Sequence, residues 1–155
     1  MKQANTHGYI GTAKIIGTRT VSLAGLKAQR ETGAQPDGSY SVTLPLPGKY
    51  CRPNVHSRTW HAKARDVKAL REAAAIAVLG HGTLFIKPEI SATFWLKTKR
   101  PWDQDNGIAS LKGAIDGLAD GRLFANDSAV TWGEIVFMKD VDSPRVVLQI
   151  RERYS

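Results

Sequence analysis

Three aspartates and one lysine in the second half of the chain have the types and spacing needed for metal-dependent chemistry on a phosphate. Asp103 and Asp105 are separated by one residue, in a segment that Pro101 predicts to be extended. Alternate side chains of an extended segment point the same way, so these two carboxylates should repel each other unless a cation lies between them. Mg²⁺ prefers such oxygen ligands and completes its shell with water and substrate phosphate.

A helix predicted over residues 106–119 adds a lysine to this group. At about 100° per residue, Asp105, Lys112 and Asp116 share one line along a continuous helix. Lys112 and Asp116 are also i,i+4 neighbours that can pair. A lysine beside metal-binding carboxylates can contact a scissile phosphate and offset the charge that develops during attack. Asp127 lies in the following turn and joins the group if the chain returns beside its earlier strand.

A simpler interpretation of the same residues stays open. Asp105 or Asn106 is a natural N-cap for the predicted helix, and Asp127 can be an ordinary turn residue. Spacing alone does not decide between a metal site and these local roles.

The elements that position these residues follow from hydrophobic periodicity. Alternation predicts strands over residues 40–46 and 90–97, and helical spacing predicts a helix over 60–79. Pro45 and Pro47 limit the first strand to an edge or an end. Residues 130–138 and 145–150 are predicted to form a hairpin. Residues 1–38 are interpreted as an appendage with a short strand around Ile10, Ile15 and Ile16 and a helix over 21–30, and residues 39–155 as the main domain.

The composition fits one basic domain. The chain has 155 residues and a formal net charge of +8, which predicts a polyanionic partner, with nucleic acid ahead of an anionic membrane. A solvated basic surface is the alternative. Cys51 is the one cysteine, so no intramolecular disulfide can form, as in a reducing compartment. With no apolar run long enough to cross a bilayer and no signal peptide expected, we expect a cytoplasmic protein without membrane contact.

Basic residues gather upstream of the acidic group and predict contacts with a DNA backbone. For those on the predicted helix, a solvated face is the alternative. The candidate DNA-binding residues are Arg52, Asn54, Arg58, Lys63, Arg65, Lys68, Arg71, Lys97, Lys99 and Arg100.

The aromatic residues divide in two. Trp60, Trp95 and Trp132 are expected in the core or in a dimer interface. Trp102, next to Asp103, is placed either against DNA or in the protein interior.

Taken together, these motifs make the chain resemble the RusA-like Holliday junction resolvases. That family carries D-x-D-N, a lysine, D-A-L or D-G-L, and D-D before a strand, after a proline-rich strand end, an S-P-N-like triplet and a basic helix. The resemblance covers roughly residues 39–153, and the order of the motifs is specific. The matching segments are Leu44-Pro45-Leu46-Pro47-Gly48-Lys49, Arg52-Pro53-Asn54, residues 63–71, Asp103-Gln104-Asp105-Asn106, Lys112, Asp116-Gly117-Leu118 and Asn126-Asp127.

The resemblance implies an α+β fold, with a mixed sheet flanked by helices, assembled as a homodimer. It implies a nuclease that resolves four-way or branched DNA by phosphodiester hydrolysis in recombination and repair. A two-fold dimer can place one site on each of two opposed strands of a junction. No organic cofactor is expected. Asp103, Asp105, Lys112 and Asp127 would be catalytic, with the three aspartates holding Mg²⁺, or Mn²⁺ in its place, and Asn106 and Asp116 in support.

Three departures from the family pattern bear on this interpretation. Lys112 follows Asp105 by seven residues rather than the family's four, although on a continuous helix both offsets return to one face. Asn126 stands where the family has the first aspartate of its pair, and the region before Ser39 matches nothing. A non-catalytic DNA-binding module and a nuclease that acts on flaps or forks are therefore the alternatives.

Overall fold

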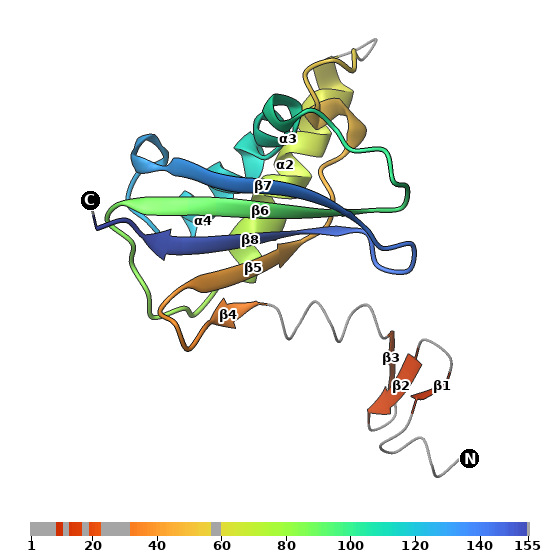
Figure 1. Ribbon diagram of the computed structural model, residues 1–155, viewed down its shortest axis with the longest axis horizontal. Coiled ribbons are helices and arrows are strands. Elements are labelled where there is room, and N and C mark those ends of the chain that lie inside the picture. The colour runs from red at the N-terminus through yellow and green to blue at the C-terminus, as the bar shows by residue number, and fades with distance from the viewer. Residues whose placement is uncertain (1–8, 11–12, 17–18, 23–31, 57–59, 155) are drawn as a thin grey trace.

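The larger part of the protein is built on one five-stranded sheet. The computed structural model describes residues 9–10, 13–16, 19–22, 32–56 and 60–154. The strands lie in the order β4-β5-β8-β6-β7, where β6 and β7 are parallel and the other neighbours antiparallel (Figure 1). The predicted α+β class with a mixed sheet is confirmed. The strands are β4 Gly33–Ala34, β5 Tyr40–Leu44, β6 Pro88–Leu96, β7 Thr131–Lys139 and β8 Arg145–Glu152.

Helices cover one face of this sheet. These are α2 (Trp60–Ala77), α3 (Gln104–Ser110) and α4 (Lys112–Asp120), which lie behind the strands in Figure 1. Alternate residues of β6 are buried beneath them, as the period-2 pattern predicted. Short 3-10 turns, η2 (Lys49–Cys51) and η3 (Asp127–Ala129), lie in the connections. No helix in these described ranges is long and apolar enough to span a membrane.

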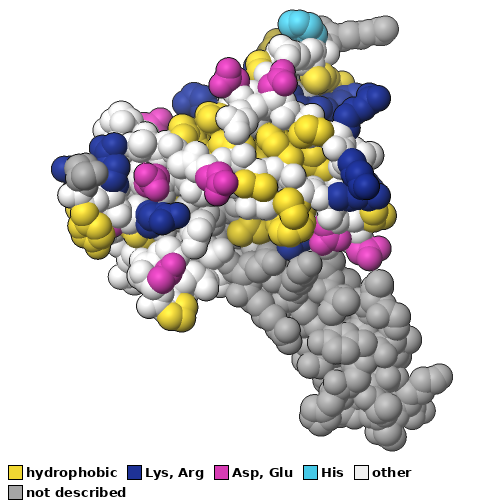
Figure 2. Space-filling view, in the orientation of Figure 1, with side chains coloured by type: hydrophobic (Ala, Val, Ile, Leu, Met, Phe, Trp, Pro, Cys, Tyr) yellow, Lys and Arg dark blue, Asp and Glu magenta, His cyan; other side chains and the backbone are white. Residues whose placement is uncertain are grey.

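The opposite face of the sheet carries no helix in the described part of the chain. Figure 2 looks onto this face, where hydrophobic side chains lie among polar and charged ones. Ser91, Thr93, Val136 and Val147 are half-buried there, and Met138 is 47% exposed. Such one-sided covering is common where antiparallel pairing dominates a sheet.

The predicted hairpin of the last two strands is wrong. β6 lies between β7 and β8, because β7 pairs parallel with β6 and β8 pairs antiparallel with both β5 and β6. A parallel neighbour needs a long crossover, which α3 and α4 supply. The chain then passes the end of β6, where the amide of Asp140 donates to the carbonyl of Leu96 at 2.8 Å. A short connection between two strands therefore does not make them neighbours here.

The helix predicted over 106–119 is two helices with a break at Leu111. The φ and ψ of Leu111 are −92° and 1°, and its amide donates to Ile108 three residues back, at 3.0 Å. The hydroxyl of Ser110 donates to the Gly107 carbonyl at 2.7 Å, a local bond that competes with regular helix pairing. The predicted alignment of Asp105 with Lys112 along one helical line requires a continuous helix, and it is therefore wrong.

The N-terminal expectations are met in part. Strands β1 (Tyr9–Ile10), β2 (Ala13–Ile16) and β3 (Arg19–Ser22) form a separate three-stranded sheet. The helix expected over 21–30 is wrong at its first two residues, which belong to β3, and its remainder lies outside the described residues. β4 pairs with β5, so the main sheet begins ahead of the boundary predicted at residue 39.

Candidate functional site

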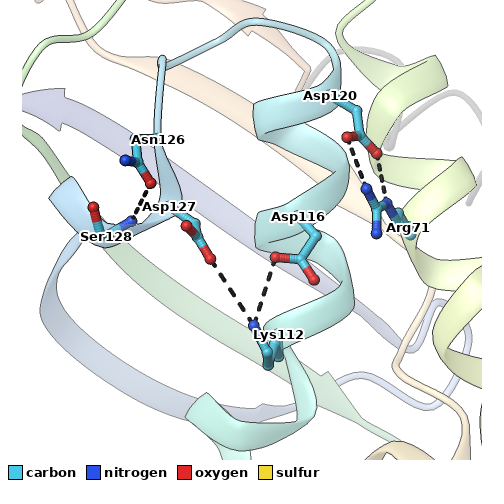
Figure 3. Close-up of polar contacts among 7 residues, drawn as sticks. All are labelled: Arg71, Lys112, Asp116, Asp120, Asn126, Asp127 and Ser128. Carbon is cyan, nitrogen blue, oxygen red and sulfur yellow. Dashed lines mark hydrogen bonds and ion pairs between the residues drawn. The ribbon is translucent and has the colours of Figure 1, made fainter.

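A lysine lies between two carboxylates at the start of α4. The ammonium nitrogen of Lys112 is 3.7 Å from Oδ1 of Asp116 and 3.9 Å from Oδ2 of Asp127 (Figure 3). The Lys112 side chain is 75% exposed, whereas those of Asp116 and Asp127 are 25% and 46% exposed. The predicted i,i+4 pair is therefore present, and the chain beyond α4 brings Asp127 back to it. We call Lys112, Asp116 and Asp127 the lysine cluster.

The turn that carries Asp127 is held by the residue before it. The side-chain oxygen of Asn126 accepts a hydrogen bond from the amide of Ser128 at 3.0 Å, which caps η3 (Figure 3). An aspartate would make the same bond, because both side chains present an oxygen at this position. Asn126 thus has a local structural role that does not depend on being a carboxylate.

Close packing of α2 on α4 adds an arginine beside the lysine cluster. Gly113, Gly117 and Gly121 recur every fourth residue of α4 and its end, and a Cβ at Gly117 would overlap the carbonyl oxygen of Arg71 in α2. The Arg71 guanidinium reaches Asp120 with two hydrogen bonds, of 2.6 and 2.9 Å. These bonds lower the pKa of Asp120 and raise that of Arg71.

Asp103 and Asp105 lie at the start of α3. Asp103 is extended (φ −64°, ψ 146°), precedes the helix and makes no side-chain cap, and Asp105 is already in the first helical turn. The extended alternation predicted for this pair is therefore wrong, because the helix begins at Gln104. The N-cap is Asp103, not Asp105 or Asn106. Both aspartates are exposed, and neither side chain has a hydrogen bond or ion pair with another described residue.

The predicted three-aspartate group is not assembled in the described ranges. Nowhere in them do three or more His, Cys, Asp or Glu side chains lie together so that they could hold a metal ion. The parallel register places the end of β6, which leads to Asp103, and the start of β7, which follows Asp127, at opposite ends of that strand pair. Asp127 instead meets the first turn of α4. Metal binding by Asp103, Asp105 and Asp127 stays a prediction. Asn106, which follows Asp105 in α3, is half-buried.

Six of the ten candidate DNA-binding residues lie in two exposed groups. Lys63, Arg65 and Lys68 are exposed on α2, and Lys97, Lys99 and Arg100 follow the end of β6. Arg71 makes two hydrogen bonds with Asp120, whereas Lys68 makes a longer ion pair with Glu72, at 3.8 Å. Asn54 is exposed, and Arg58 lies outside the described residues.

Arg52 is held against Trp102, whose ring also packs on Phe94. The guanidinium carbon is 4.8 Å from the Trp102 ring centre, and Arg52 Nε is buried without a hydrogen-bond partner among the described residues. The centroids of Trp102 and Phe94 are 5.2 Å apart. Trp102 is half-buried and packs against the core, and its contact with DNA stays a prediction.

The other tryptophans differ from one another. Trp60, the first residue of α2, is 73% exposed, so it is not a core residue, and its alternative place in a dimer interface stays a prediction. Trp95 and Trp132 are half-buried.

Sequence reasoning missed the pairing of Arg71 with Asp120. Asp120 is four residues after Asp116 and so continues its line along α4, which is the signal that could have placed a third acidic residue here. Its partner comes from a helix 49 positions earlier, which no local pattern specifies.

Comparison with known proteins does not place the chain in a family. No protein-family model matches it, and no curated protein is similar enough to count as a relative.

Proposed function

We propose that this protein is a metal-dependent, structure-selective endodeoxyribonuclease that resolves four-way DNA junctions, as its resemblance to RusA-like resolvases implies. The observation that carries the proposal is the lysine cluster, in which one ammonium group lies within 4 Å of carboxylates from α4 and η3. The three residues also belong to the sequence motifs that resemble the RusA-like family, and that resemblance does not use their positions in space. If each residue acted only as a cap or a turn residue, the three side chains would have no reason to lie together.

The roles in this proposal follow from chemistry and exposure. Lys112 contacts the scissile phosphate, and Asp116, the least exposed member of the cluster, holds its ammonium group. In this proposal Asp103, Asp105 and Asp127, which do not form one acidic group in the described ranges, would be the oxygen ligands for Mg²⁺ or Mn²⁺. A bound metal would supply activation of water and stabilisation of charge on the attacking and leaving oxygens. Because Asp103 and Asp105 have no described partner, their carboxylates are available as ligands.

The surrounding charges suit a DNA backbone. The chain has a formal net charge of +8, and the exposed Lys63, Arg65 and Lys68 lie on the helix that packs against α4. Backbone contacts of this kind give salt-dependent affinity with little sequence information. Binding to a junction should therefore weaken steeply as salt rises.

Cleavage of a synthetic four-way junction in Mg²⁺ tests the proposal. We expect Lys112→Gln and Asp127→Asn to slow cleavage by about a hundredfold or more, the usual effect of removing one charge-stabilising group, while junction binding persists. Asp142→Asn, an exposed aspartate in the β7–β8 connection, is the matched control and should cleave normally. Wild-type protein that cuts no branched DNA with any divalent metal would refute the catalytic proposal.

The ligand set needs a separate measurement. Mn²⁺ binding, followed by electron paramagnetic resonance in the presence of a junction, should weaken in Asp103→Asn, Asp105→Asn and Asp127→Asn. Asp116→Asn should affect cleavage more than Mn²⁺ binding, because its carboxylate is assigned to Lys112. If Mn²⁺ affinity depends on Asp116 and Asp127 but not on Asp103 or Asp105, the metal binds at the lysine cluster and the proposed ligand set is wrong.

A non-catalytic protein that binds branched DNA is the second candidate. The observation that favours it is the lack, in the described part of the chain, of three acidic side chains gathered for a metal. Full junction binding without cleavage in Mg²⁺ or Mn²⁺ would select this candidate. A panel of flaps and forks separates junction resolution from a nuclease with another preferred substrate.

The proposed assembly is a homodimer, since a four-way junction has near two-fold symmetry. The proposed location is the cytoplasm. The helix-free sheet face around Val136 and Val147 is the candidate surface for a second copy. Light scattering after size-exclusion chromatography should give twice the mass of the 155-residue chain.

A further inference from the structure

A hollow of about 260 Å³ lies beside the lysine cluster and is apolar on one side. Its apolar wall includes Ile108, Ile115, Val130 and Trp132. These residues come from α3, α4 and the start of β7, so the hollow is built where the two helical segments meet the returning strand. Concave sites with apolar walls and a few charged groups at one edge are the usual form of a ligand site.

Trp132 sets this hollow apart from an ordinary gap in packing. Among the described residues, Trp60 and Trp102 contact other rings, and Trp95 has the Arg145 guanidinium 4.8 Å from its ring centre. Trp132 alone of the four tryptophans has neither a ring nor a cation packed on its indole in that part of the chain. A half-buried indole with no aromatic partner can stack against a flat ligand.

A second hollow, of about 270 Å³, lies on the other side of the two carboxylates. Asp116 and Asp127 border both hollows, and the second is also bordered by Asn126 and by Arg71 with its ion-pair partner Asp120. Asp116 and Asp127 therefore lie between the apolar space and a polar space that holds the Arg71–Asp120 ion pair. Lys112 borders the apolar space, so its ammonium group and that space match the anionic phosphate and the flat base of one nucleotide.

We propose that the apolar hollow takes one unstacked nucleobase of the strand that is bound at Lys112. The base lies against Trp132, and the phosphodiester of the same nucleotide lies against the ammonium group, whose side chain is 75% exposed. The ligand is an unpaired base, because a base inside a duplex is stacked on both faces and has to leave the stack to enter such a pocket. This inference rests on the proposed function for its strand and extends it to a base-binding site.

Binding of DNA that carries 2-aminopurine tests the inference. A junction with this fluorescent base at the crossover is titrated with protein in Ca²⁺, which permits binding without requiring cleavage. We expect wild-type protein to change the fluorescence, and Trp132→Ala to lose that change and bind roughly tenfold more weakly, the usual effect of removing one base-stacking contact. Trp60→Ala, at an exposed tryptophan outside the hollow, is the matched control and should behave as wild type.

A second variant guards against loss of folding in Trp132→Ala. Ala109 is exposed and lines the same hollow, so Ala109→Leu fills the space without removing a core side chain. Loss of the fluorescence change in both variants supports the inference. Unchanged fluorescence and affinity in Ala109→Leu overturns it, even if Asp127→Asn abolishes cleavage. A 2-aminopurine fluorescence change that depends on Trp132, in a protein that cuts no DNA, would support the base-binding site. The same result would refute the catalytic proposal.

Discussion

Replacing Gly117 with alanine should separate α2 from α4. A Cβ at this position would overlap the carbonyl oxygen of Arg71 and lie 2.8 Å from the Cβ of Ala74. Contacts below 3.0 Å essentially never occur for real Cβ atoms, and the overlapped atom belongs to the backbone of α2 rather than to a flexible side chain. One of the two helices must therefore move.

The expected loss of stability is the balance of two opposing effects. Adding a methyl group to a packed interface costs about 1–3 kcal/mol, and the upper end applies here because backbone must shift. Alanine regains about 1 kcal/mol over glycine in helix propensity. The net loss is about 2 kcal/mol, which corresponds to a fall of roughly 4–8 °C in Tm for a chain of this length.

Urea unfolding followed by circular dichroism measures this loss, with Gly82→Ala as the control. A methyl group at Gly82 would have no atom within 4 Å, so this variant should stay within about 0.5 kcal/mol of wild type. A Gly117→Ala protein as stable as wild type would refute the close packing of α2 on α4. That packing is what brings Arg71 to the site.

Three further predictions concern single side chains. Asp140→Ala should lower the free energy of unfolding by about 3–5 kcal/mol, as measured by denaturant titration. The reason is that the Arg145 side chain, which is 4% exposed, stays charged after it loses its 3.0 Å ion pair. A loss below about 1 kcal/mol would contradict the buried pair. Asn126→Asp should keep junction cleavage within about twofold, whereas Asn126→Ala should lose about 1 kcal/mol of stability with the η3 cap. Arg71 lowers the pKa of Asp120 in the folded protein below its value in the unfolded chain. The stabilisation that the pair gives to the folded state is therefore present at neutral pH and is lost as the pH falls through the lower, folded-state pKa of Asp120. Stability curves of wild type and Asp120→Asn should therefore converge in acid, and a gap that widens there would count against the pair.

Two wrong predictions have the same physical origin. The hairpin of β7 and β8 and the continuous helix through Leu111 both rest on residues close in sequence. Strand partners depend on how the whole sheet packs, and here β8 lies inside the sheet between β5 and β6. The helix break depends on the hydrogen bond from Ser110 to Gly107 and on the packing of Gly107, whose Cβ position lies 3.2 Å from Phe137. Hydrophobic periodicity along the sequence indicates neither the strand partners nor the helix break.

Features that arise within one helix or strand are predictable from the residues alone. Alternating apolar residues define β5 and β6, helical spacing defines α2, and the i,i+4 spacing of Lys112 and Asp116 defines their ion pair, since each depends only on the local repeat of the backbone.

Contacts between different helices and strands are known from the three-dimensional arrangement and not from residue spacing. This arrangement brought Asp127 to Lys112, joined Arg71 to Asp120, and left Asp103 and Asp105 at the start of α3, outside any described acidic group. These outcomes follow from the parallel placement of β7 beside β6 and from the glycines that let α2 approach α4. Contacts between distant segments depend on how the whole chain packs, and residue spacing carries no information about that.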